Sequence, residues 1–267
     1  MKKRVLATIL CVAMALSLMA CGNTGDQGKD DKKPAQMKYS KQTIYDTKTG
    51  ELRQETETKY DQNGRETYKK TTLYSSIPEQ SEPSSLEYQY NWVVDGNKAT
   101  ADTGKGLVVT CIYDEDGNLI ERTEASVGTK TVAEYTYENG KKTVVKNTTY
   151  QGDTVYMIRE NFYDTYGNAY KNVTTIPSTN TTYTTEYDIE YDEKGVPVAF
   201  RVTTDGQTTE KISITYGYDA NGHVSKVEIV GMSRNEYVRD ANGNILEAKS
   251  YNGDVVQSHV IYEYYGN

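Results

Sequence analysis

Three acidic residues at alternate positions are the clearest group whose types and spacing could do chemistry. Glu186, Asp188 and Glu190 share one face of an expected β-strand, with neighbours about 7 Å apart. Carboxyl groups at such separations can serve glycoside hydrolysis. A solvated strand face has the same composition, and the row continues with Thr184 rather than an apolar cleft. We therefore expect no catalytic residue here, and keep a polysaccharide-acting enzyme as an alternative.

The two histidines, His223 and His259, are the other residues that could support catalysis. His223 directly follows a turn glycine, and His259 lies in an expected hairpin near the end of the chain. No G-x-S-x-G or H-E-x-x-H motif accompanies them, so we expect neither a Ser-His-Asp triad nor a zinc site.

Residues 114–118, D-E-D-G-N, hint at a calcium loop because two Asp side chains alternate there. A calcium hand needs Gly at its sixth position and Glu at its twelfth, whereas Gly117 is fourth. We expect a turn, with weak calcium binding as the alternative, and predict no metal site and no cofactor.

Aromatic side chains recur at alternate positions in one expected strand, at Tyr88, Tyr90 and Trp92. Such a row can stack on sugar rings, so these three are the candidate ligand-binding residues. The alternative is that they pack in the core against a neighbouring hairpin.

The spacing of a short motif shows what must position these residues. The pattern Tyr-Asp-x-x-Gly occurs five times, at residues 60–64, 113–117, 163–167, 191–195 and 218–222. Degenerate copies are residues 45–50, 137–140 and 239–243. Eight copies at near-regular spacing indicate an internal repeat of about two strands with their turns.

Each repeat is expected to be a β-hairpin. Tyr187, Ile189 and Tyr191 alternate with polar residues, as a strand with one buried face requires. Asp then bonds its own backbone, and Gly takes the positive φ of a tight turn. The predicted turn glycines are Gly64, Gly117, Gly167, Gly195, Gly222 and Gly243.

The repeat resembles the YD repeats of the RHS family of bacterial surface and secreted proteins. The resemblance rests on Y-G-Y-D-A-N-G at residues 216–222 and on I-Y-D-E-D-G-N-L-I at residues 112–120. It covers most of the chain from Tyr45 on, although the family's usual Arg after the turn glycine appears once, as Arg65. It implies extended β-hairpin sheets and, in some members, carbohydrate binding or cargo enclosure.

The first twenty residues have the pattern of an export signal, with three basic residues before an apolar stretch at residues 5–19. Leu18-Met19-Ala20-Cys21 resembles a lipobox, which implies cleavage before Cys21 and a diacylglycerol on its thiol. The alternatives are an ordinary signal peptide and an uncleaved anchor. Residues 21–37 are polar and Gly-rich, and we expect a flexible tether there.

Charge and cysteine usage narrow the choice of partner. Cleavage would change the formal net charge from −8 to −11, because three basic residues leave with the signal. A domain this acidic is a poor candidate for binding nucleic acid.

Cys111 would be the remaining unmodified cysteine, and we expect a small buried core residue, with a reactive thiol as the alternative.

Residues 38–267 are predicted to form one all-β domain, an antiparallel meander of hairpins in a large twisted or curled sheet. A β-sandwich is the alternative. Because 25 Tyr replace most Leu, Phe and Trp, we expect a thin core with Tyr hydroxyls near its rim. The last strand, at residues 260–265, must be an edge or pair with an earlier strand.

These features predict a surface-exposed, non-catalytic lipoprotein on the outer side of the cytoplasmic membrane, or on the outer membrane if the envelope has two. Its expected partners are the membrane, through the lipid, and a glycan or envelope protein. The alternative is a structural or assembly lipoprotein that pairs through a sheet edge.

Overall fold

The computed structural model describes residues 36–46, 48–74 and 82–265. The predicted signal peptide, Cys21 and most of the predicted tether lie outside these residues. The described chain forms twenty strands and one short 3-10 helix, η1 (Pro177–Thr179). It divides into two compact units, which we name the terminal unit (residues 36–89 and 213–265) and the central unit (residues 90–212).

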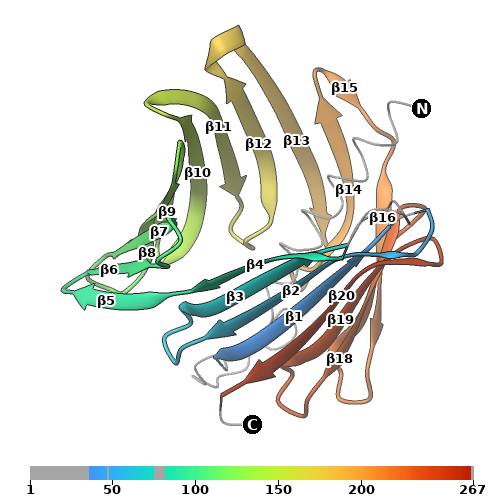
Figure 1. The fold of residues 1–267 in the computed structure, drawn as a ribbon. Helices are drawn as coiled ribbons and strands as arrows, with labels where there is room; N and C mark the ends of the chain where they lie inside the picture. The colour runs from blue at the N-terminus through green and yellow to red at the C-terminus, as the bar shows by residue number, and fades with distance from the viewer. Residues whose placement is uncertain (1–35, 47, 75–81, 266–267) are drawn as a thin grey trace. The chain divides into compact units, whose positions relative to one another are not determined.

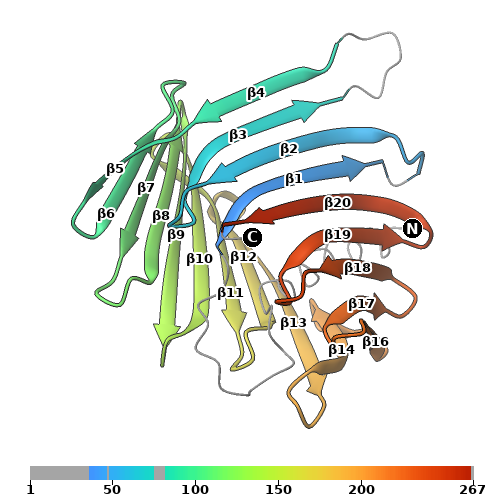
Figure 2. The same cartoon turned by 90° about the horizontal axis from the view of Figure 1, so that it is seen from below.

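The terminal unit is one antiparallel sheet built from both ends of the chain (Figure 2). In spatial order its strands are β4 (Ser84–Gln89), β3 (Glu66–Leu73), β2 (Leu52–Tyr60), β1 (Met37–Tyr45), β20 (Val255–Tyr264), β19 (Ile245–Asn252), β18 (Ser233–Arg239), β17 (Val224–Ile229) and β16 (Ile212–Tyr218).

The last strand is not an edge of this sheet. β20 pairs with β19 on one side and with β1 on the other (Figure 1). Gln42 on β1 lies opposite Val260 on β20. The sequence analysis expected residues 260–265 either to form a sheet edge or to pair with an earlier strand. The structure shows the second arrangement, with β1 as the earlier strand. The free edge considered for residues 260–265 is therefore wrong.

The central unit is a second antiparallel sheet in which each strand neighbours the next in sequence. Its strands are β5 (Asn91–Asp95), β6 (Lys98–Asp102), β7 (Val108–Tyr113), β8 (Leu119–Ser126), β9 (Thr129–Glu138), β10 (Lys141–Gln151), β11 (Thr154–Tyr163), β12 (Ala169–Ile176), β13 (Thr181–Tyr191), β14 (Pro197–Thr204) and β15 (Gln207–Thr208). The predicted all-β antiparallel meander is thus confirmed.

The Tyr-Asp-x-x-Gly turns repeat one hydrogen-bonding pattern. In the copy at residues 191–195, Asp192 Oδ1 accepts the backbone N–H of Lys194 at 2.9 Å and of Val196 at 2.8 Å. The N–H of Gly195 donates to the carbonyl of Asp192 at 3.0 Å, with φ of +76° at the glycine. The other five predicted turn glycines also have positive φ, from +76° to +84°.

Each full copy also carries a β-bulge beside its tyrosine, which the sequence analysis did not predict. Strand register shifts next to Tyr60, Tyr113, Tyr163, Tyr191 and Tyr218. A bulge adds one residue to one strand and increases the local twist. The repeat therefore sets both the turn and the twist of each hairpin.

The core consists mainly of small and β-branched side chains. Phe200, Ile229 and Val109 are the largest side chains that are fully buried. Of the tyrosines that the structure describes, only Tyr90 and Tyr237 are buried, and the rest are half-buried or exposed. Tyrosines thus line the margins of the core more than they fill it.

Candidate functional site

The carboxylate row on β13 is engaged in ion pairs. Glu186 Oε1 lies 2.9 Å from Lys171 Nζ, and Asp188 Oδ2 lies 3.1 Å from Arg201 Nη1. Glu190 pairs with Arg201 at 3.4 Å and also with Lys211. These side chains are largely solvent-exposed, where such pairs contribute about 0–1 kcal/mol each. The arrangement fits a solvated strand face.

The two histidines lie in different places and contact different carboxylates. The backbone N–H of His223 donates to Asp219 Oδ1 at 2.9 Å within a turn, and this bond is the main reason why the pKa of Asp219 lies below its usual value. The imidazole Nδ1 of His223 lies 3.6 Å from Asp219 Oδ2. His259 Nε2, on β20, lies 2.9 Å from Glu247 Oε1 on β19. Each histidine thus faces one carboxylate of its own neighbourhood.

The acidic loop at residues 114–118 is a repeat turn. Asp114 Oδ1 accepts the N–H of Asp116 at 3.0 Å and of Asn118 at 2.8 Å, and its Oδ2 accepts the Asn118 side-chain amide at 2.9 Å. That side-chain bond is the first cause of a lowered pKa at Asp114. In the described part of the chain, no group of three or more His, Cys, Asp or Glu is placed to hold a metal ion.

Cys111 is a buried residue of β7, with 3% of its surface exposed. It lies opposite Ala99 on β6 and Arg122 on β8. The expectation of a small core residue is confirmed, since a side chain this inaccessible is a poor target for oxidation.

The structure does not present the three candidate aromatic residues as one row. The expected single strand is interrupted at Tyr90, where β4 ends and β5 begins. Tyr88 pairs across from Lys69 in the terminal unit, while Trp92 pairs across from Ala101 in the central unit. Tyr90 is 6% exposed, and the other two are half-buried. At Tyr90 the alternative of a core residue is therefore correct.

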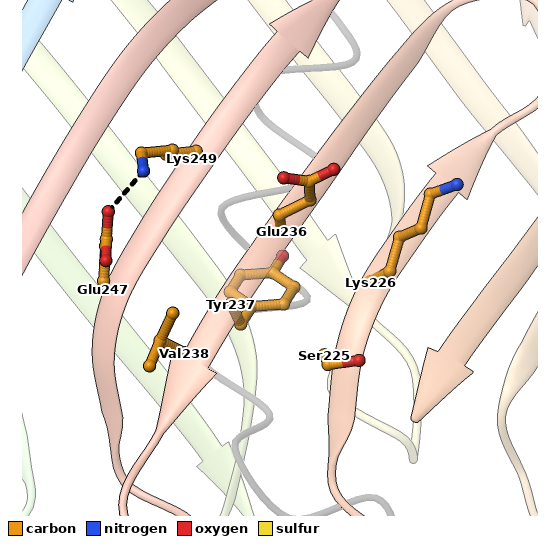
Figure 3. A pocket seen from close by; sticks show the side chains of 7 residues that line it. All are labelled: Ser225, Lys226, Glu236, Tyr237, Val238, Glu247 and Lys249. Carbon is orange, nitrogen blue, oxygen red and sulfur yellow. Dashed lines mark ion pairs between the residues drawn. The ribbon is translucent and has the colours of Figure 1, made fainter. Parts of the chain in front are cut away.

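A shallow depression of about 340 Å³ lies over β17, β18 and β19 (Figure 3). Its lining residues are Ser225, Lys226, Glu236, Tyr237, Val238, Glu247 and Lys249. The charges in it are compensated, since Lys249 pairs with Glu247 at 2.6 Å and Lys226 with Glu228 at 2.8 Å. The Lys249 ammonium lowers the pKa of Glu247, and that carboxylate in turn raises the pKa of Lys249. The depression offers no unpaired charge to a ligand.

A polar face of the central sheet was missed by the sequence analysis. Arg159 on β11 lies opposite Asn147 on β10 and Thr174 on β12, and Thr174 lies opposite Tyr183 on β13. Two residues along, Asn161 and Asn172 face each other, and the Asn172 amide donates to Asn161 Oδ1 at 2.6 Å. We name Asn147, Arg159, Asn161, Asn172, Thr174 and Tyr183 the amide face.

The signal for the amide face is present in the sequence but is ambiguous there. R-E-N at residues 159–161 and N-V-T at residues 172–174 alternate as strands should. Which of these polar residues meet depends on the register between β11 and β12, and that register is set by the bulge beside Tyr163.

Comparisons with known proteins identify no family. No family model matches the chain, and no curated protein is significantly similar. A solved porin-like protein from Bacteroides uniformis is 11% identical with a TM-score of 0.48, over 86% of this chain and 99% of that one. A porin-like protein from Bacteroides vulgatus is 12% identical with a TM-score of 0.44, over 86% and 100%. The Tc holotoxin pore of Photorhabdus luminescens is 14% identical with a TM-score of 0.32, over 87% of this chain and 13% of that one.

Similarities at this level carry no argument about the function of this chain. Within the part of the chain that the structure describes, no helix has the length and apolar character needed to cross a bilayer.

Proposed function

We propose that this chain is a lipid-anchored envelope protein whose β-hairpin sheets act as a non-catalytic binding module for a glycan. The proposed binding role is supported by a difference in side-chain chemistry between the two faces of the central sheet. The carboxylates that could have been catalytic are ion-paired, whereas the amide face presents an arginine, amides, a hydroxyl and an aromatic ring. Such a set recognises sugar hydroxyls without reacting with them.

The anchor is proposed from the sequence at Leu18-Met19-Ala20-Cys21. A thiol-linked diacylglycerol supplies two acyl chains, which hold a protein at a membrane far more firmly than one. Polar residues 22–37 would then span about 20–25 Å as a random coil. That reach would lift the sheets clear of the lipid headgroups, on the outer side of the cytoplasmic membrane or on an outer membrane.

A pull-down on insoluble peptidoglycan together with a glycan array tests the binding role. The mature chain from Gly22 on would be used, so that the lipid does not cause retention by itself. We expect retention on at least one of the two supports, and elution by the matching soluble glycan. No retention on any glycan would contradict the proposal.

A second candidate function, assembly through a sheet edge, is favoured by a specific observation at β5. Among the strands that the structure describes, β6 is the one with which β5 has a pairing register. Val93 and Val94 on β5 are 70% and 56% exposed, which is unusual for adjacent apolar residues of a strand. Two copies of β5 paired antiparallel about Val93 would place Trp92 opposite Val94, a favourable aromatic–aliphatic pair.

Sedimentation velocity of the mature chain tests this second candidate. Self-association that Val93→Lys abolishes would support it, because a charge at an edge blocks strand pairing. A monomer at all concentrations, or a dimer that survives Val93→Lys, would contradict it.

A further inference from the structure

We propose that the amide face on β10–β13 binds a sugar chain that carries carboxylate groups. This inference rests on the proposed function and deepens it, since it names the site and the chemical class of the ligand. Its premises are the charge of Arg159, the hydrogen-bonding groups around it and the exposed ring of Tyr183.

Among the described residues, Arg159 is the arginine whose guanidinium has no interaction partner. The structure describes seven arginines, and six of them have ion pairs, hydrogen bonds or ring contacts. Arg159 has none among the described residues and is exposed. In a chain of net charge −8, an exposed guanidinium that pairs with no carboxylate, backbone carbonyl or aromatic ring of the described residues is available to a ligand. Its planar fork of donors suits a carboxylate, which it can bind through two parallel hydrogen bonds.

The neighbours of Arg159 are neutral donors and acceptors. Asn147 and Thr174 flank it on the adjacent strands, and Thr174 Oγ1 donates to Asn172 Oδ1 at 3.3 Å. Asn161 accepts a hydrogen bond through its carbonyl oxygen, which leaves its two amide hydrogens for a ligand. No acidic residue lies in these two rows. Glu124, on β8 of the same face, is paired with Arg122 at 2.8 Å.

Tyr183 completes the face with an apolar surface. It lies opposite Thr174 and is 48% exposed, and its ring can lie against the apolar face of a sugar. Strands lie about 4.8 Å apart, so the row from β10 to β13 extends roughly 14 Å. That length fits several linked sugar units better than a single ring, and an acidic polysaccharide better than a free sugar acid.

Affinity electrophoresis of the full-length lipoprotein in detergent, through gels that contain polygalacturonate, tests the inference. We expect the wild type to be retarded and Arg159→Gln to raise the apparent Kd at least about tenfold. Arg201→Gln is the matched control: it removes the same charge from the opposite face, where Arg201 pairs with Asp188. It should bind like the wild type. Circular dichroism would verify that both variants fold.

Three results would overturn the inference: no retardation of the wild type by polygalacturonate, equal retardation of Arg159→Gln, or equal losses in the two variants. The second and third would show that the amide face is not the site. If the wild type binds peptidoglycan or a neutral glycan but not polygalacturonate, this inference fails and the proposed function stands. If it binds no glycan at all, both fail.

Discussion

Tyr191 joins two consecutive repeats, and its replacement by Phe is the most informative single change. The Tyr191 hydroxyl donates to Asp164 Oδ2 in the preceding repeat turn, and it accepts the Asn168 side-chain amide at 3.2 Å. Its ring stacks on that of Tyr166 with centroids 4.5 Å apart. Tyr191→Phe removes both hydrogen bonds and keeps the ring contact.

The expected cost follows from the charge of Asp164 and the burial of Asn168. A hydrogen bond to a charged group contributes about 1.5–3 kcal/mol to stability. Asn168 is buried, so its amide cannot replace the lost partner with bulk water. We expect Tyr191→Phe to lower the free energy of unfolding by about 2 kcal/mol, or Tm by roughly 4–8 °C.

Urea denaturation of the mature chain, followed by circular dichroism, measures this cost. Tyr218→Phe is the control, because Tyr218 begins the next repeat but is 59% exposed, and it should change stability by less than about 0.5 kcal/mol. Equal, small effects of the two substitutions would refute the view that Tyr191 couples the repeats.

The pH dependence provides a second test of the same bond. Burial, then the bond to Asp164, raises the pKa of Tyr191 above its ordinary value of 10.0. A raised pKa in the folded state means that the stabilisation is complete below about pH 10 and is lost as the pH rises further. The difference in stability between wild type and Tyr191→Phe should therefore shrink above pH 10. A constant difference up to pH 12 would contradict this assignment.

Two further predictions concern particular positions. Gly195→Ala would place a Cβ 2.4 Å from the Tyr166 ring at a φ of +76°, so it should lower the urea midpoint more than Gly222→Ala does. A Cβ at Gly222 would meet open space, and that substitution should cost only about 1–2 kcal/mol of backbone strain. Equal midpoints for the two variants would contradict this prediction. Burial raises the pKa of Tyr237 to about 12, so absorbance at 295 nm should show a late ionisation whose amplitude Tyr237→Phe lowers by one tyrosine. The stabilisation that this hydroxyl contributes should fade between about pH 10 and 12. An unchanged titration curve would argue against burial of this hydroxyl.

The strands and turns were predictable because their signals are local. Alternation at Tyr187, Ile189 and Tyr191 and the turn at Asp192 and Gly195 each lie within a few residues, and the structure contains all of them. The bulge beside each Tyr-Asp was missed because it leaves the alternation on either side intact. Local pattern thus predicted the hairpins but not their twist.

Long-range pairing was harder to predict. β1 pairs with both β2 and β20, and nothing in the periodicity of residues 37–45 selects a strand that follows some 200 residues later. The interruption at Tyr90 was hidden for the opposite reason, since alternation continues from Tyr88 to Trp92 across the junction of two units. Arg159 stood out only once its cross-strand neighbours, Asn147 and Thr174, were known.

Mass spectrometry of the N-terminal peptide, from protein isolated from membranes of the native host, is the most direct test of the central claim. We predict that the mature chain begins at Cys21 and carries a diacylglycerol on that thiol, and that Cys21→Ala releases the protein from the membrane fraction. A mature N-terminus elsewhere, or a Cys21 without lipid, would contradict the account of a tethered surface protein.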